Sequence, residues 1–120
     1  KCNGATTIEA WGDGSSTREF LYVKDAAEGI ALATERYDHE DPVNLGSGRE
    51  ISIRDLVDLI ARVTDFNGEI VWNTEKPNGQ ARRSLDISRA RQFGFEAKMP
   101  FSVGLRQTVE WFLNHGTDLF

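Results

Sequence analysis

Apolar positions alternate with polar ones near the start of the chain and recur with helical spacing further on. Residues 7–11 (TIEAW) alternate as a half-buried strand does, and the turn residues Gly-Asp-Gly-Ser follow at 12–15. Short apolar runs rich in strand-forming residues occur at 20–23 (FLYV), 43–45 (VNL) and 70–72 (IVW). The pattern therefore predicts about four short strands.

Helical periodicity marks four further segments. They are expected to begin at Asp25, Ser52, Asp86 and Ser102. Asp25 and Glu28 have the spacing of a capping box, in which each side chain satisfies a free backbone N–H. Ser52 is a favourable N-cap, and Asn67-Gly68 is expected to end the helix that it begins. The short third helix is expected to end at Gly94.

The resulting order is β, β, α, β, α, β, α, α, which indicates a mixed α/β (α+β) fold with about four short strands and four helices. A length of 120 residues suits a single domain over residues 1–120. Four short strands seldom complete a sheet, so we expect other protein to cover some strand edges.

Composition narrows the classes of protein to consider. Hydrophobic residues make up 39% and charged residues 28%, as in ordinary soluble proteins. The apolar runs are too short for a membrane span, and no signal segment is visible, so a cytoplasmic location is expected. A net charge of −5 argues against binding nucleic acid or anionic membrane. Cys2 is the only cysteine, which excludes an internal disulfide, and we expect it to be incidental.

Residues suited to catalysis do not occur in the required patterns. The turn at 46–48 (GSG) lacks the third glycine of a dinucleotide-binding loop, so no cofactor site is predicted. Tyr22 and Tyr37 are not followed four residues later by a lysine that would lower their pKa. His39 and His115 stand apart from other ligand-forming residues, so no metal site is predicted. The chain alone is therefore expected to be non-catalytic.

Arginines offer a different kind of chemistry. Arg18 follows a turn and precedes an apolar run, while Arg82 and Arg83 follow the flexible loop 76–80 (KPNGQ). Guanidinium groups match two phosphate oxygens at once, so these two places could converge on one diphosphate. Ordinary ion pairing is the alternative. Trp11 ends a predicted strand near a loop, where its ring could stack on a base or sugar or pack in the core.

Three segments, in the same order, resemble motifs of the extended short-chain dehydrogenase/reductases. Residues 11–25 contain WGDG followed by REFLYVKD, and residues 44–56 contain NLGSG followed by SIRDL. Residues 76–86 (KPNGQARRSLD) are similar to the version typical of GDP-L-fucose synthases and their close relatives. The resemblance covers nearly the whole chain.

In that family the carboxyl-terminal part covers a sugar nucleotide, while a Rossmann core binds NAD(P) and carries the catalytic Ser, Tyr and Lys. The resemblance implies that this chain corresponds to the carboxyl-terminal part, without the Rossmann core. The substrate-binding positions that it implies are Trp11, Arg18, Lys76, Asn78, Arg82 and Arg83. Arg18 and Arg83 would contact the diphosphate, and Asn78 would meet the nucleotide. The family commonly has Asp at position 78, and an amide there leaves uridine and thymidine open beside guanosine.

Two main hypotheses follow. The chain is the substrate-binding part of an NAD(P)-dependent nucleotide-sugar epimerase or reductase, and its partners are a nucleotide-diphosphate sugar and a missing Rossmann domain. Alternatively, it is a non-catalytic, self-associating module derived from such an enzyme, whose partner is a second copy of itself. An unrelated anion-binding α/β domain is a third possibility.

Overall fold

The computed structural model describes residues 4–116, so Cys2 lies outside the described residues. The strands are β1 (Thr7–Trp11), β2 (Thr17–Glu19), β3 (Glu50–Ser52), β4 (Glu69–Asn73) and β5 (Arg82–Arg83). The helices are α1 (Val23–Arg36), α2 (Ile53–Val63), α3 (Ser88–Gln92) and α4 (Phe101–His115). The predicted class, a mixture of short strands and four helices, is confirmed.

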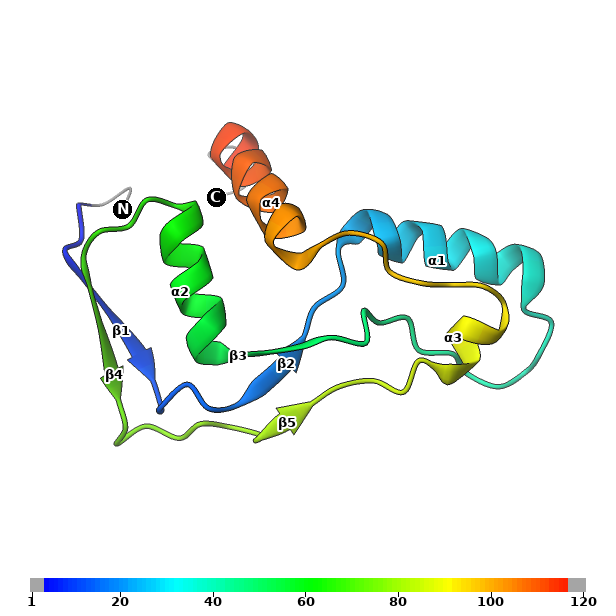
Figure 1. Cartoon of the computed structure of the whole chain (residues 1–120), viewed down its shortest axis with the longest axis horizontal. Coiled ribbons are helices and arrows are strands. Elements are labelled where there is room, and N and C mark those ends of the chain that lie inside the picture. Colours follow the sequence, from blue (N-terminus) through cyan, green and yellow to red (C-terminus); the bar gives the residue numbers. More distant parts are fainter. Residues whose placement is uncertain (1–3, 117–120) are drawn as a thin grey trace.

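The strands form two small sheets. β1 and β4 pair in parallel, from Thr7 opposite Glu69 to Trp11 opposite Asn73. In the other sheet β2 lies in the middle, antiparallel to β3 and parallel to β5. This sheet brings together segments that are more than thirty residues apart in sequence, and it forms the centre of the molecule (Figure 1).

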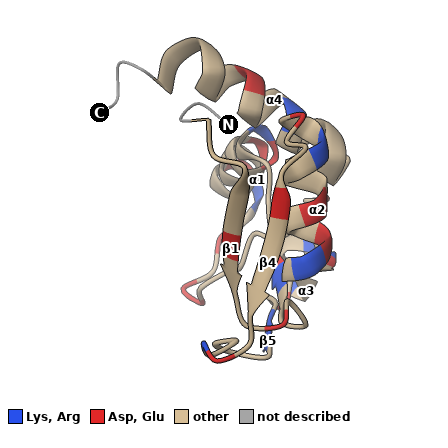
Figure 2. Cartoon of the chain, turned by 90° about the vertical axis from the view of Figure 1, so that its left-hand side faces the viewer, with Lys and Arg blue, Asp and Glu red and all other residues tan. Residues whose placement is uncertain are grey.

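The chain is elongated. The β1–β4 pair and α2 lie at one end, and α1 and α3 lie at the other (Figure 1). Figure 2, viewed from the first end, shows β1 and β4 side by side. The molecule measures 52 × 34 × 24 Å and has a radius of gyration of 17.2 Å. A compact domain of this length has a radius of gyration of about 14 Å.

The buried core is correspondingly small. Among the described residues, the buried hydrophobic side chains are Ala90 of α3, Phe93 and Phe95, and they pack against residues of α1 such as Leu32 and Ala33. The accessible surface is 8745 Å², whereas a compact monomer of this mass exposes about 6,500 Å². The excess surface includes many large hydrophobic side chains, so the chain leaves more of its apolar surface in solvent than a self-sufficient domain does.

The strand predictions are partly confirmed. β1 coincides with the predicted strand at 7–11, and β4 contains the predicted strand at 70–72. The predicted strands at 20–23 and 43–45 are wrong. Residues 20–22 instead connect β2 to α1, which begins at Val23. The sheet hydrogen bonds are made by the preceding residues 17–19.

Ser52 caps α2 as predicted, because its Oγ accepts a hydrogen bond from the Asp55 backbone N–H at 3.0 Å. The predicted end of this helix at Asn67-Gly68 is wrong. The helix ends at Val63, and the residue with a positive φ is Asp65, at 50°.

The predicted capping role of Asp25 is also wrong. Helix α1 begins two residues earlier, at Val23, and the buried Asp25 carboxylate accepts hydrogen bonds from the backbone N–H groups of Lys98 (3.3 Å) and Met99 (3.0 Å). Asp25 therefore joins α1 to the segment that leads into α4.

The last two helices begin close to their predicted positions. α3 begins at Ser88 because Asp86 turns back and accepts the Ser88 N–H at 2.9 Å, and it ends at Gln92 instead of Gly94. α4 begins at Phe101, one residue before the predicted Ser102, directly after Pro100.

Candidate functional site

Two loops meet at the end of the central sheet. The turn 12–16 follows β1, and the loop 76–81 follows β4, so the parallel pairing of these strands brings both loops to the same end. The backbone N–H of Gly12 donates to the Asn73 carbonyl at 2.9 Å, and the N–H of Thr17 donates to the Ala81 carbonyl at 2.9 Å. Hydrogen bonds at both ends of the turn thus hold the two segments side by side.

Arg18 and Arg83 become neighbours through this arrangement. They lie directly opposite each other on the parallel strands β2 and β5, and paired residues of adjacent strands present their side chains on the same face. Arg18 Nη1 donates hydrogen bonds to the backbone carbonyls of Thr17 (2.6 Å) and Gln80 (2.8 Å). Neither guanidinium pairs with a carboxylate of residues 4–116.

Arg82 faces the other way. The alternation along β5 places it on the opposite face from Arg83, where its Nε lies 2.9 and 3.0 Å from the two carboxylate oxygens of Glu50. The same carboxylate accepts a hydrogen bond from Thr17 Oγ1 at 2.8 Å. The Arg82 hydrogen bonds, followed by that from Thr17, hold the pKa of Glu50 below its ordinary value. The structure therefore separates Arg82 from the Arg18–Arg83 pair.

Trp11 and Lys76 lie close together where the turn 12–16 and the loop 76–81 begin. The indole ring of Trp11 is 64% exposed, and the Lys76 ammonium lies 5.5 Å from its ring centroid, a cation–π distance. Asn78 lies against the turn instead, where its Oδ1 accepts the Asp13 N–H at 2.8 Å.

Arg54 supports the turn, and the sequence interpretation did not include it. Its guanidinium lies 4.5 Å from the ring centroid of Trp72, and its Nη2 donates to the Asp13 carbonyl at 2.6 Å. A Cβ added at Gly14, whose φ is +76°, would approach the Trp72 ring to 2.7 Å. Trp72 is therefore a packing residue beneath the turn, and the absence of a Cβ at Gly14 allows that contact.

The turn at Gly46–Gly48 does not fit a dinucleotide. The N–H of Gly48 donates to Glu19 Oε1 at 2.8 Å, and Glu19 Oε2 accepts the Leu85 N–H at 2.9 Å. A phosphate group binds through backbone N–H groups that are free to donate. Here the Glu19 carboxylate already accepts the Gly48 N–H, so an anionic cofactor would have to displace this carboxylate.

Other chemistry of the described residues is limited. Across residues 4–116, no group of three or more His, Cys, Asp or Glu side chains could hold a metal ion. His39 contacts the Tyr37 ring, and His115 stacks on Trp111 with its ring centroid 5.0 Å away. None of the helices within the described ranges has the length and apolar character needed to cross a membrane.

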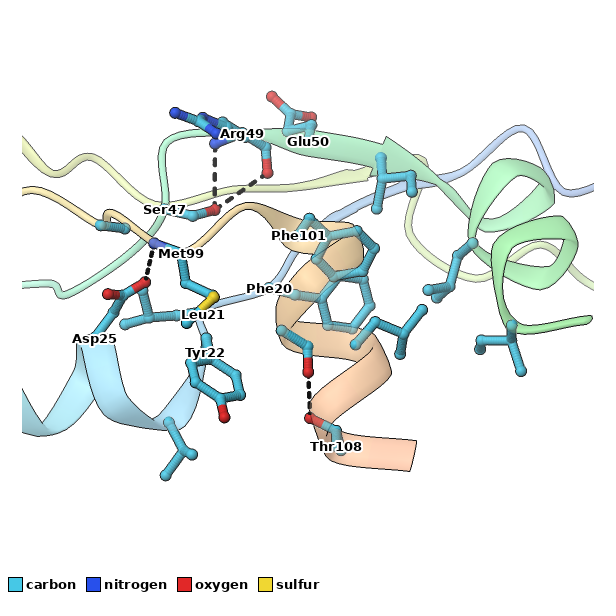
Figure 3. A pocket seen from close by; sticks show the side chains of 17 residues that line it. Phe20, Leu21, Tyr22, Asp25, Ser47, Arg49, Glu50, Met99, Phe101 and Thr108 are labelled. Carbon is cyan, nitrogen blue, oxygen red and sulfur yellow. Dashed lines mark hydrogen bonds between the residues drawn. The ribbon is translucent and has the colours of Figure 1, made fainter. Parts of the chain in front are cut away.

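An apolar groove of about 610 Å³ lies on the helical side of the central sheet. Its lining comes from the β2–α1 connection, β3, α2, α4 and the segment that precedes α4, and it includes Phe20, Leu21, Met99 and Phe101 (Figure 3). The rings of Phe20 and Phe101 pack with centroids 5.6 Å apart. Neither Arg18 nor Arg83 lines the groove, and its largely apolar lining does not suit a charged ligand.

Comparison with known proteins gives concordant matches. Residues 1–46 match the NAD dependent epimerase/dehydratase family. GDP-L-fucose synthase 1 of Arabidopsis thaliana is 39% identical over 115 residues, which cover 96% of this chain and 36% of the relative. A crystal structure of a GDP-L-fucose synthetase from Naegleria fowleri matches 97% of this chain and 36% of that chain, with a TM-score of 0.89 and 28% identity.

A UDP-glucose 4-epimerase from Thermotoga maritima, solved with UDP-glucose, matches 90% of this chain and 35% of that chain, with a TM-score of 0.79 and 30% identity. The chain thus spans about a third of the length of the relatives that it matches. The three motifs, the fold and these likenesses agree: residues 1–46 match the NAD dependent epimerase/dehydratase family, and nearly the whole chain is similar to part of the GDP-L-fucose synthases.

Proposed function

We propose that this chain is the substrate-binding part of an NAD(P)-dependent nucleotide-sugar epimerase or reductase, in which Arg18 and Arg83 bind the diphosphate of the sugar nucleotide. The observation that carries the proposal is the pairing of these arginines on β2 and β5, without a carboxylate partner among residues 4–116.

Like charges directly opposite each other in a sheet repel, and a bound dianion would remove that repulsion. Adjacent strands lie about 4.8 Å apart, a separation at which two long side chains can each reach one phosphate of a diphosphate. Arg18 is already held by two backbone carbonyls through Nη1. Its remaining donors can therefore meet a ligand with little further loss of side-chain freedom.

Trp11, beside Lys76, offers an exposed aromatic surface for the sugar or base. The relatives named GDP-L-fucose synthase and UDP-glucose 4-epimerase use different bases. Guanosine, uridine and thymidine diphosphate sugars are all candidates, and NAD(P) would be bound by residues other than these.

The test is calorimetric titration of the chain with GDP-, UDP- and dTDP-sugars. Each charge-assisted hydrogen bond contributes about 1.5–3 kcal/mol, so the Arg18→Ala, Arg83→Ala double variant should bind at least about tenfold more weakly. Arg82→Ala is the matched control, because it removes the neighbouring guanidinium on the other face. Equal heats for wild type and the double variant, or an equal loss for Arg82→Ala, would count decisively against the proposal.

The apolar groove favours a second function of the same chain, which is to pack against other polypeptide. We propose that further residues of the enzyme cover it, because the chain spans about a third of its relatives' length and exposes side chains such as Val23, at 69%, at the edge of the groove. When the chain is isolated, we expect it to self-associate through this surface.

Light scattering over a range of concentrations tests this expectation. Val23→Asp should weaken self-association, whereas Val71→Asp, which changes an exposed valine of β4 away from the groove, should not. A strict monomer at high concentration would contradict the expectation. Equal effects of the two variants would show that the groove is not the surface involved.

A further inference from the structure

Asn78 makes two hydrogen bonds to the turn that follows β1. Its side-chain Oδ1 accepts the backbone N–H of Asp13 at 2.8 Å, and its backbone carbonyl accepts the hydroxyl of Ser16 at 3.0 Å. Ser16 is only 3% exposed, and a buried hydroxyl that loses its partner is destabilising. Both oxygens of Asn78 are therefore turned inward, toward the protein.

Close packing reinforces this contact. Gly12 has a φ of +78°, and a Cβ at that position would collide with Asn78 Oδ1. The carboxylate of Asp13 also lies close to the Asn78 amide. Hydrogen bonds from the side chain and backbone of Ser15, with a smaller contribution from Asn78, hold the pKa of Asp13 below its ordinary value. The residue at position 78 thus faces a carboxylate and a backbone N–H together.

The contacts continue directly into the two strands that carry the arginines. Beyond Ser16, the Thr17 N–H donates to the Ala81 carbonyl at 2.9 Å, and Arg18 Nη1 donates to the Gln80 carbonyl at 2.8 Å. These bonds fix the loop 78–81 along the segment 13–18, and this alignment sets which residue of β5 lies opposite Arg18. Asn78 makes the first contact of this series.

We propose that Asn78 is a positioning residue that locks the turn 12–16 to the loop 76–81 and thereby holds Arg18 opposite Arg83, instead of reading the base of the nucleotide. The role in ligand binding rests on the proposed function, whereas the lock itself does not.

The amide also explains why this position suits Asn in this chain. An aspartate could accept the Asp13 N–H equally well, but it would place a second carboxylate beside that of Asp13. Two neighbouring carboxylates repel. Exchanging the two side chains, as Asp13→Asn with Asn78→Asp, would restore one amide and one carboxylate at the contact without changing the net charge.

The experiment measures hydrogen exchange of the Asp13 amide by NMR without ligand, and the affinity for UDP and GDP by calorimetry. Asn78→Ala should speed exchange at Asp13 by about tenfold and weaken diphosphate binding by about fivefold to tenfold. Asn78→Asp should weaken binding comparably, and the Asp13→Asn, Asn78→Asp exchange should restore affinity to within about twofold of wild type. Asn67→Ala is the matched control, because Asn67 makes its hydrogen bond to Asp65 in a turn away from the site.

Each outcome decides a separate point. Unchanged exchange at Asp13 in Asn78→Ala would overturn the lock, even if the wild-type chain binds diphosphate well. Faster exchange with unchanged affinity would overturn the positioning role, and so would a failure of the exchanged pair to recover affinity. A wild-type chain that binds neither UDP nor GDP would overturn the proposed function and the positioning role with it, while the exchange measurement would still show whether Asn78 locks the loops.

Discussion

The loop end and the helical end of this chain are held by different kinds of interaction. At the loop end, the turn 12–16 and the loop 76–81 are joined by direct hydrogen bonds, and the buried hydroxyl of Ser16 has a partner. On the helical side, a core of Ala90, Phe93 and Phe95 supports α1 and α3, while the apolar groove lined by the β2–α1 connection, α2 and α4 stays open. The loop end is therefore complete within the chain, and the helical end is not.

This difference separates the proposed ligand binding from the proposed assembly. The backbone that carries Arg18 and Arg83 is fixed by local polar contacts, so its geometry does not require the groove to be filled. The groove, in contrast, gains apolar burial only when other polypeptide covers it. Substitutions at the loop end should therefore change the affinity for a ligand, whereas substitutions in the groove should change self-association.

The largest expected effect on stability comes from the small core. Phe95 is 2% exposed and lies against Gly29 of α1, so Phe95→Ala should lower the free energy of unfolding by about 3–5 kcal/mol. Phe20→Ala, which changes a groove residue that is 40% exposed, should cost less than about half as much in the isolated chain. Urea unfolding followed by circular dichroism measures both values.

Equal losses of stability for Phe95→Ala and Phe20→Ala would contradict the contrast between the core and the groove, because they would mean that the groove is already as well buried as the core. If further polypeptide covers the groove as proposed, Phe20→Ala should cost more stability in that complex than in the isolated chain.

An intermediate effect is expected at Asp25, which links α1 to the segment before α4. Asp25→Ala leaves the Lys98 and Met99 N–H groups without their acceptor, and should lower the free energy of unfolding by about 1–3 kcal/mol. Asp25→Asn keeps one acceptor oxygen and should lose less than Asp25→Ala. Identical losses in urea unfolding would show that these hydrogen bonds do not stabilise the helical end.

Local signals in the sequence were sufficient for some elements. The cap at Ser52 depends on residues within one helical turn, and the strands at 7–11 and 70–72 have clear turn boundaries, so all three were predicted correctly. The run at 20–23 has strand-forming composition, but all four of its residues line the groove between helices. Composition alone does not distinguish a strand from an apolar connection that packs on helices.

Long-range pairing limited the rest of the prediction. Asp25 accepts hydrogen bonds from residues more than seventy positions away, so its capping-box spacing was misleading. The resemblance named Arg82 and Arg83 together, yet their opposite orientations follow from the strand β5, which the sequence pattern did not predict. The inward-facing oxygens of Asn78 likewise follow from a contact across 65 positions.

The smallest expected effect concerns the face of the central sheet opposite the arginine pair. Because the Arg82 and Thr17 hydrogen bonds lower the pKa of Glu50 in the folded state, Glu50 stabilises the fold at pH values above its ordinary pKa of about 4.5. This contribution is lost as the pH falls through the lower, folded-state pKa. The group is exposed, so the change should be small and should diminish at high salt.

Urea unfolding between pH 7 and pH 3 should therefore show a slightly steeper loss of stability in wild type than in Arg82→Ala, which removes the main cause of the shift. Arg83→Ala should keep the wild-type slope, because Arg83 lies on the other face and does not contact Glu50. If Arg83→Ala flattened the slope as much as Arg82→Ala, the two faces would share one electrostatic environment. The separation of the proposed diphosphate site from the Glu50 ion pair would then fail.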